Sequence, residues 1–206
     1  MSTTTRLTRK GQATRERILQ AAADLILRNG VAGTQIDDVR KAAGVSGSQM
    51  THYFHDKHHL IADVVAWQAQ ANLDNHRLPV VGGLDSFASL REWARLLLER
   101  QEQLAYVGGC MFGSLAGQLV ESDPDIRAGL ADGFERLLEL FRAGLTAMRE
   151  RGDLRADADP EQLALVLVTA MQGGLLLTQT LRRPDPLRNA LDAAITHVET
   201  FAPAPR

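Results

Sequence analysis

Apolar residues recur three and four positions apart along most of the 206-residue chain, which is the spacing of one face of an α-helix. The pattern predicts an all-α fold of about nine helices. The first helix is expected over residues 14–28, and two short helices are expected within residues 34–57. The other six are expected over residues 57–73, 86–105, 110–120, 124–151, 160–181 and 185–201. The helix over 160–181 is apolar nearly all round, so we expect it to be covered on both sides.

The two short helices within residues 34–57 are joined by a tight turn that contains glycine. Thr34 and Ser46 are suited to cap the two helices at their N-termini, and Gly44 is suited to end the first one. Val45 and Met50 are spaced to pin the second helix to the core, and the residues around it are otherwise small or polar. An ordinary helical hairpin is the alternative. The combination is typical of a helix-turn-helix unit, whose second helix enters the major groove of DNA.

Charge is divided unevenly along the chain, although the whole carries a formal net charge of −2. Residues 1–60 hold nine Lys and Arg against five Asp and Glu, whereas residues 61–206 hold fourteen against twenty. A basic head on an acidic body fits a DNA-binding module with a sensor or partner domain. We expect the polar, basic residues 1–12 to be disordered without DNA, either as a solvated tail or as an arm that contacts DNA.

The stretch AGVSGSQMTHYFHDKHHL resembles the recognition segment of the TetR family of bacterial transcriptional repressors. The shared positions are Thr34, Ala43-Gly44-Val45-Ser46, His52-Tyr53-Phe54, Lys57 and Leu60. The close match covers residues 12–62, and the rest of the chain matches in helical layout only. The resemblance implies a three-helix DNA-binding head and a larger ligand-binding and dimerisation body. It also implies a ligand-released repressor that binds a palindromic operator as a homodimer.

The resemblance and the helix-turn-helix pattern together define a predicted DNA-binding surface. The residues expected to face the bases are Ser48, Gln49, Thr51 and His52. The residues that the resemblance places at phosphates are Thr34, Tyr53 and Lys57. The other members of this surface are Arg40, Ser46 and Gly47. Lys57 also lies at the start of a helix, where free amides and a positive charge favour phosphate.

The clearest break in composition is residues 74–84, with one proline and two glycines. We divide the chain into an N-terminal arm and DNA-binding domain, residues 1–56, and an effector-binding and dimerisation domain, residues 57–206. The helices over 160–181 and 185–201 are expected to form a four-helix interface in a two-fold dimer. The interface residues are expected to be Leu163, Val166, Leu167, Leu177, Leu187, Leu191, Ile195 and Val198.

An effector pocket in the body is implied by the resemblance, and core packing is the alternative for each of its residues. The candidates are Trp67, Trp93, Tyr106, Met111, Phe112, Gln118, Met171 and Gln172. The single cysteine, Cys110, excludes an intrachain disulfide and fits a reducing cytoplasm. A buried structural thiol is favoured at Cys110, and electrophile or redox sensing is the alternative.

The chain contains no phosphate-binding glycine loop, HExxH or CxxC motif. The sequence GGCMFGS resembles a glycine-flanked nucleophile, but no strand is predicted to support one. We therefore expect no enzyme activity and no cofactor, and we expect the histidines at 52, 55, 58 and 59 at the surface or facing phosphate rather than binding a metal. A helical enzyme and a non-specific architectural DNA binder are the alternative functions.

No secretory signal is visible, and the apolar run over residues 163–177 is predicted to be too short and mixed to span a bilayer. The sequence therefore predicts a cytoplasmic protein with three partners. These are double-stranded operator DNA, a second copy of the chain and an unidentified small-molecule effector, with no membrane.

Overall fold

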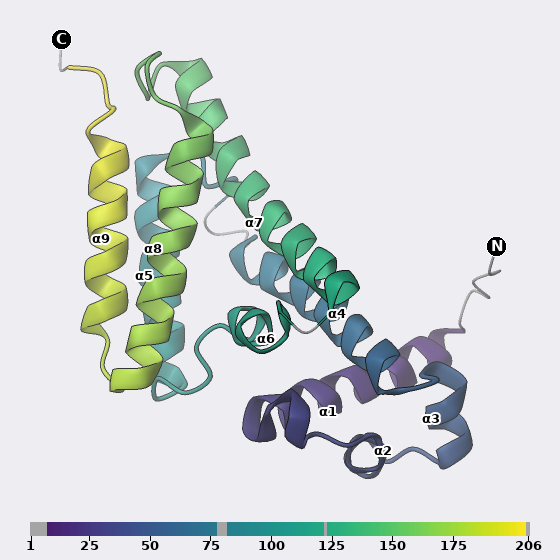
Figure 1. The fold of residues 1–206 in the computed structure, drawn as a ribbon. Helices are drawn as coiled ribbons and strands as arrows, with labels where there is room; N and C mark the ends of the chain where they lie inside the picture. The colour runs from purple at the N-terminus through teal and green to yellow at the C-terminus, as the bar shows by residue number, and fades with distance from the viewer. Residues whose placement is uncertain (1–7, 78–81, 122, 205–206) are drawn as a thin grey trace. The chain divides into compact units, whose positions relative to one another are not determined.

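The computed structural model describes residues 8–77, 82–121 and 123–204, and these residues form nine α-helices (Figure 1). No strand occurs within these ranges, so the all-α prediction is confirmed. The helices are α1 (Arg9–Gly33), α2 (Ile36–Ala43), α3 (Gly47–Tyr53), α4 (Lys57–His76), α5 (Phe87–Gln103), α6 (Met111–Leu119), α7 (Pro124–Arg151), α8 (Pro160–Leu181) and α9 (Asp185–Glu199).

The helices belong to two compact units. The first unit comprises Met1–Gln68 and Leu115–Leu130, and the second comprises Ala69–Ser114 and Ala131–Arg206. Helices α1, α2 and α3 lie in the first unit, α5, α8 and α9 lie in the second, and α4, α6 and α7 contribute residues to both. The division that the sequence predicts, after residue 56, stays a prediction.

The core of the first unit is built from the apolar faces of α1, α2, α3 and α4. Ile18 and Val39 are fully buried, Met50 is 3 % exposed and Phe54 is 2 % exposed. Each large side chain buried in this way contributes about 1.5–3 kcal/mol of hydrophobic stabilisation. This core fixes the short α3 on the longer helices.

Helix α1 differs from its prediction at both ends. It begins at Arg9, because Thr8 Oγ1 accepts the Gly11 amide at 3.2 Å, so residues 9–12 are helical and not a disordered arm. The rest of the predicted arm, residues 1–7, lies outside the described residues. At the predicted end, Gly30 has φ 71° and ψ 169°, which breaks the helix, and one further turn follows over residues 31–33.

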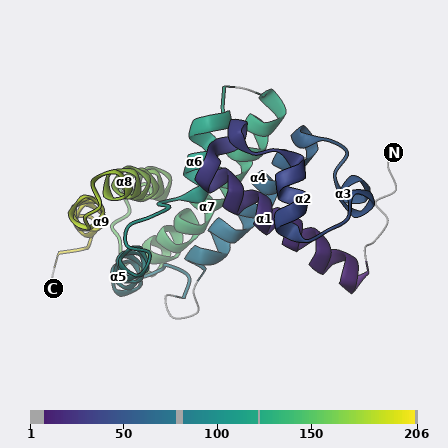
Figure 2. The same cartoon turned by 90° about the horizontal axis from the view of Figure 1, so that it is seen from below.

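The core of the second unit joins α5, α7, α8 and α9. Helices α8 and α9 lie side by side in both views, and α5 also contacts α9 (Figure 2). The rings of Trp93 and Phe141 meet edge to face with centroids 4.9 Å apart. Trp93 Nε1 donates a hydrogen bond to His76 Nδ1 at 2.9 Å. Burial, with a smaller effect of the Arg100 charge, lowers the pKa of His76 to about 4, so this ring is neutral at pH 7.

Helix α8 has one buried and one exposed apolar face. Leu163, Leu167 and Met171 are at most 2 % exposed, whereas Leu176 is 62 % exposed. Helix α8 has 22 residues, and an 18-residue stretch of it has a mean hydropathy of 1.5. By length and composition alone it could cross a membrane, so the prediction that this segment is too short and mixed was wrong. The core helices of soluble proteins pass the same test, and 44 % of this span is buried inside the protein.

Candidate DNA-binding surface

Helix α3 begins with a capping box, in which two side chains and two backbone amides bond reciprocally. Ser46 Oγ accepts the Gln49 amide at 3.2 Å, and Gln49 Oε1 accepts the Ser46 amide at 2.9 Å. Gly44 ends α2 in the left-handed conformation, with φ 62° and ψ 40°. The predicted N-cap at Ser46 and stop at Gly44 are confirmed. Together they fix the turn between α2 and α3.

The outward side of α3 is polar. Met50 is buried in this helix, and Val45 just before it is 5 % exposed, as the spacing predicts. The residues predicted to face the bases, Ser48, Gln49, Thr51 and His52, are all exposed. A helix held by one apolar anchor therefore presents hydrogen-bonding side chains to solvent. This is the surface that major-groove recognition requires.

The sequence predicts Thr34 as the N-cap of α2, and the structure shows a different role. Gln35 precedes α2, and its side chain makes no capping bond. Thr34 is 3 % exposed, and its hydroxyl donates to the Gly30 carbonyl at 2.8 Å. The N-cap prediction was wrong because the break at Gly30 places this carbonyl within reach of the hydroxyl.

The start of α4 is held against the end of α1 by polar contacts. Asp56 Oδ1 accepts the His59 amide at 2.8 Å, so Asp56 caps α4. Lys57 Nζ donates to the Ala32 carbonyl at 3.4 Å. Arg15, near the start of α1, forms an ion pair with Asp63 at 2.5 Å, so α4 is also joined to the other end of that helix. The Lys57 contact places its ammonium beside the last turn of α1.

The three histidines that follow α3 make ring and ion-pair contacts. His55 and His59 stack with centroids 5.6 Å apart and an interplanar angle of 14°. His58 Nε2 lies 2.6 Å from Asp123 Oδ2. Over the described residues, no group of three or more His, Cys, Asp or Glu is placed to hold a metal ion.

Two side chains of Leu115–Leu130 contact residues of Met1–Gln68 within the first unit. Gln118 Oε1 accepts the Val31 amide at 2.8 Å, and Asp123 pairs with His58. The partners are 87 and 65 residues apart in sequence, so no local pattern identifies them. The sequence analysis placed Gln118 in an effector pocket; its side-chain oxygen is bonded to α1, and the pocket role stays a prediction.

The predicted effector residues are divided between the two units and differ in exposure. Trp67 and Gln118 belong to the first unit, and the other six belong to the second. Three of the predicted effector residues in the second unit are at most 1 % exposed and belong to its core. They are Trp93, Phe112 and Met171. The half-buried members of that unit are Tyr106, Met111 and Gln172.

Cys110 is half-buried at the start of α6, in the second unit. Its Sγ accepts the Gly113 amide at 3.3 Å and the Gln172 Nε2–H at 3.5 Å, and it lies 3.9 Å from Asn72 Oδ1. The thiol therefore has polar neighbours from three helices. Both interpretations of Cys110 stay predictions.

A pocket of about 340 Å³ opens on the second unit, away from the predicted effector residues. It is lined by Leu73, Arg77, Glu135, Arg136, Leu138, Glu139, Arg142 and Glu161. Arg142 is already paired with Glu139 and Glu161. The charges of this pocket are therefore partly neutralised by one another.

Most of the predicted dimer residues are already buried within one chain. Those that are at most 2 % exposed are Leu163, Leu167, Leu187, Leu191, Ile195 and Val198. They pack between α8, α9 and the rest of the second unit's core, so they have no surface left to bury against a second copy. Of the predicted residues, Val166 is half-buried and Leu177 is 51 % exposed.

A three-helix head with a capped, polar recognition helix, joined to a helical body, defines a DNA-binding regulator of the helix-turn-helix class. The family model described as "Bacterial regulatory proteins, tetR family" matches residues 18–64. The model described as "Tetracyclin repressor-like, C-terminal domain" matches residues 86–194. The chain therefore belongs to the TetR family of transcriptional regulators.

Three individual proteins that are similar to this chain are also named as transcriptional regulators or repressors. The transcriptional regulator AcuR of Cereibacter sphaeroides is 28 % identical over 184 residues, which cover 84 % of this chain and 79 % of AcuR. The HTH-type transcriptional repressor AcnR of Corynebacterium efficiens is 26 % identical, over 89 % of this chain and 92 % of AcnR. A TetR transcriptional regulator from Chloroflexus aurantiacus superimposes with a TM-score of 0.81 at 25 % identity, over 95 % of this chain and 98 % of its own. The chain is a DNA-binding transcriptional regulator.

Proposed function

We propose that the protein is a cytoplasmic repressor that binds a palindromic operator as a homodimer and is released by a small molecule bound in residues 57–206. The observation that carries this proposal is the polar outward side of α3, on a helix anchored through Met50. The relative AcnR, which is named as a transcriptional repressor, supports repression. The proposed division after residue 56 separates the DNA contacts from the effector and dimer contacts, with Lys57 at the boundary.

The bases are proposed to meet Ser48, Gln49, Thr51 and His52. His52 is exposed, and its ring lies edge-on to Tyr53 with centroids 4.9 Å apart. Gln49 would have to leave the capping box, because its side-chain oxygen is bonded to the Ser46 amide. Loss of an N-cap interaction costs about 1 kcal/mol, whereas a bidentate contact to a base contributes about 1–3 kcal/mol. Replacing the capping bond of Gln49 by a contact to DNA is therefore favourable only where Gln49 meets a base with which it can form both hydrogen bonds.

The phosphates are proposed to meet Lys57, Tyr53 and Arg40 near the ends of the recognition helix. Lys57 Nζ has three N–H donors and gives one of them to the Ala32 carbonyl at 3.4 Å, so the others can meet a phosphate, which is a strong partner for an ammonium. Arg40 is held by Asp37 on its own helix at 2.8 Å. Thr34 is a poorer candidate, because it is buried and its hydroxyl points inward to Gly30.

The dimer is proposed to form through the exposed face of α8 together with α9. The exposed leucines of α8 are Leu165, Leu176, Leu177 and Leu181. Gly173 lies on the same side of the helix, and a Cβ there would meet nothing within 4 Å. A small residue between leucines lets a second α8 approach closely. These four leucines therefore replace the six buried residues of the predicted interface.

The effector is proposed to bind in the body among the half-buried residues Tyr106, Met111 and Gln172. Ligand binding there releases DNA only if the two conformers of the regulator bind the ligand with different affinities. A screen of small molecules that raise the melting temperature, followed by measurement of their effect on DNA affinity, tests this part.

Selection of bound DNA from a random pool, at near-physiological salt and with the purified protein, tests the operator. We expect a palindromic sequence to be enriched. A folded, dimeric protein that enriches no sequence and keeps only a salt-dependent affinity would instead be the architectural DNA binder.

A further inference from the structure

The last turn of α1 is separated from the rest of the helix. Gly30 has φ 71° and ψ 169°, so the Val31 amide has no carbonyl within α1 to bond to. This turn carries two residues that matter for the head. Its Ala32 carbonyl accepts the Lys57 ammonium at 3.4 Å, and Thr34, which ends it, bonds back to the Gly30 carbonyl at 2.8 Å.

Gln118, near the end of α6, supplies the missing partner. Its Oε1 accepts the Val31 amide at 2.8 Å, across 87 residues of sequence. A Cβ placed at Gly30 would lie 3.2 Å from the same oxygen, so the glycine also leaves room for the contact. A backbone amide only donates, so the oxygen of the Gln118 amide must face it.

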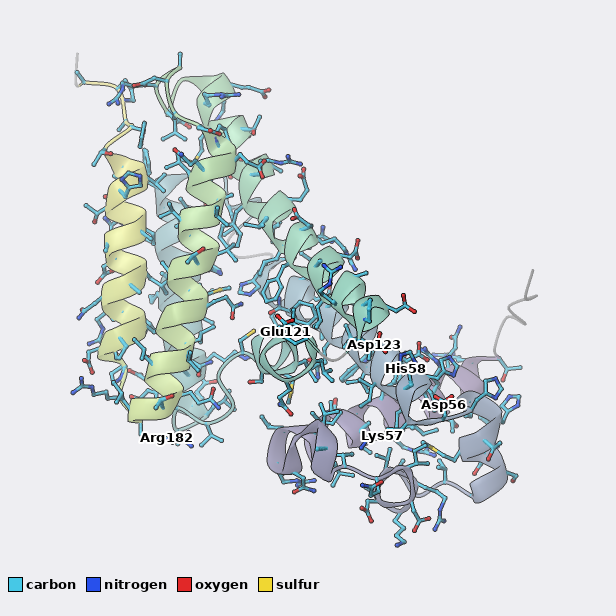
Figure 3. All side chains as sticks on the ribbon, in the orientation of Figure 1. Asp56, Lys57, His58, Glu121, Asp123 and Arg182 are labelled. Carbon is cyan, nitrogen blue, oxygen red and sulfur yellow. The ribbon has the colours of Figure 1, made fainter. Side chains whose placement is uncertain are left out.

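Asp123 makes a second tie from the same part of the chain. Its Oδ1 accepts the Asp125 and Ile126 amides at 2.9 and 3.0 Å, at the start of α7. Its Oδ2 lies 2.6 Å from Nε2 of His58, the residue after Lys57 (Figure 3). The amide of Ile126 and then the His58 ring keep the pKa of Asp123 below its usual value, so the carboxylate is ionised at pH 7.

We propose that Gln118 and Asp123 are positioning residues for DNA binding. Gln118 holds the last turn of α1, whose Ala32 carbonyl accepts the Lys57 ammonium, and Asp123 holds His58, the residue of α4 that follows Lys57. Leu115–Leu130 shares a compact unit with Met1–Gln68, as this role requires. The inference rests on the proposed phosphate contact of Lys57. It adds that α6 and the start of α7 set the affinity for DNA without touching it.

Substitutions at Gln118 test the hydrogen bond to the Val31 amide by removing or keeping the acceptor oxygen. Gln118→Leu has a similar size and lacks the acceptor, whereas Gln118→Glu keeps an acceptor oxygen for the Val31 amide. We expect Gln118→Leu to weaken binding to the selected DNA by ~10-fold, the scale of one lost positioning hydrogen bond. We also expect the slope of log K against log salt concentration to fall by about 1, because Lys57 loses its phosphate. Gln118→Glu should bind as the parent does.

Substitutions at His58 test the second tie without disturbing the cap of α7. His58→Ala removes the partner of Asp123, and His58→Gln retains an N–H donor for it. The alanine variant should lose affinity by ~5-fold and the glutamine variant should recover it. Gln20→Leu, on the exposed side of α1, is the matched control for glutamine loss and should change neither affinity nor slope.

Amide hydrogen exchange measures the Gln118 bond directly, without DNA. The Val31 amide should be protected in the parent protein and in Gln118→Glu, and should exchange faster in Gln118→Leu. This readout also shows whether each variant is folded, because the core amides of α1 should stay protected in all of them.

The outcomes distinguish a failure of the positioning role of Gln118 from a failure of the proposed phosphate contact of Lys57. If Gln118→Leu binds like the parent while Lys57→Ala binds weakly, the positioning role is wrong and the phosphate contact stands. If neither change affects binding, the phosphate contact itself is wrong. Equal losses in Gln118→Leu and Gln118→Glu would also overturn the inference, because the acceptor atom would then be irrelevant.

Discussion

Helices α3 and α8 differ in what they offer to a partner. Helix α3 has seven residues, buries Met50 alone and exposes hydroxyl, amide and imidazole groups. Helix α8 has 22 residues, buries one side in the core of its unit and exposes leucines on the other. A polar face can be read by hydrogen bonds to base edges, whereas an apolar face gains free energy only by leaving water. The first suits DNA and the second suits a second copy of the chain.

A charge on the exposed face of α8 should have the largest effect. We expect Leu176→Glu to raise the dimer dissociation constant by ~1,000-fold, because a two-fold interface buries the unpaired charge twice. Sedimentation at a range of protein concentrations measures this constant. Leu27→Glu, at a leucine of α1 that is 41 % exposed, is the control and should leave the dimer intact. A dimer that survives Leu176→Glu would exclude this face as the interface.

The core behind α8 should lose stability in acid through His76. Its pKa is about 4 in the folded protein and about 6.5 when unfolded, so the unfolded state binds more protons between these values. The free energy of unfolding should therefore be highest above pH 6.5 and fall by up to about 3 kcal/mol as the pH approaches 4. His76→Gln removes the titration and offers Trp93 an acceptor. Denaturant unfolding at several pH values should show a weaker pH dependence in this variant; an unchanged dependence would exclude His76 as its cause.

Three substitutions in α3 and at the start of α4 should separate base contacts from phosphate contacts. We expect Lys57→Ala to weaken binding to all sequences by ~10-fold and to lower the salt slope by about 1. We expect His52→Ala, and likewise Gln49→Ala, to change the preference among sequences. Fluorescence anisotropy on the selected site and on single-base variants of it measures both. Equal effects of the three changes on every DNA would contradict the assigned roles.

The turn that orients α3 should show the smallest effect. A methyl group added at Gly44 or at Gly47 would meet nothing within 4 Å, but only Gly44 has a positive φ. We expect Gly44→Ala to lower the free energy of unfolding by about 1 kcal/mol, because an L-residue is strained in the left-handed conformation. Gly47→Ala is the matched control and should be neutral or slightly stabilising. Thermal unfolding of both variants shows whether the positive φ of Gly44 or the space for a side chain determines the cost of a substitution in this turn.

The fold and the head were largely predictable because their signals are local. The cap at Ser46 and the stop at Gly44 need only neighbouring residues, and both are present in the structure. The helix predicted over residues 86–105 begins one residue later, at Phe87, because Ser86 forms a capping box with Ser89. The exact first residue of a helix depends on capping geometry that composition does not contain.

The parts that were missed depend on contacts between distant residues. Thr34 bonds inward because α1 breaks and continues past Gly30, and Gln118 contacts α1 from 87 residues away. The apolar pattern of α8 was recognised, but the pattern does not say which leucines the chain buries itself. Leu163 and Leu167 face the core, and Leu176 faces solvent. The predicted interface therefore included six residues that the chain buries itself, together with the exposed Leu177 and the half-buried Val166.

Hydroxyl-radical footprinting of the protein on its selected DNA tests the central claim most directly. A dimer that inserts one α3 into each half-site should protect two equivalent patches on one face of the duplex, with centres about 10–10.5 base pairs, or 34–36 Å, apart. Leu176→Glu should abolish both patches together. A single asymmetric patch, or uniform protection that slides along the DNA, would contradict a symmetric dimer that reads its operator through α3.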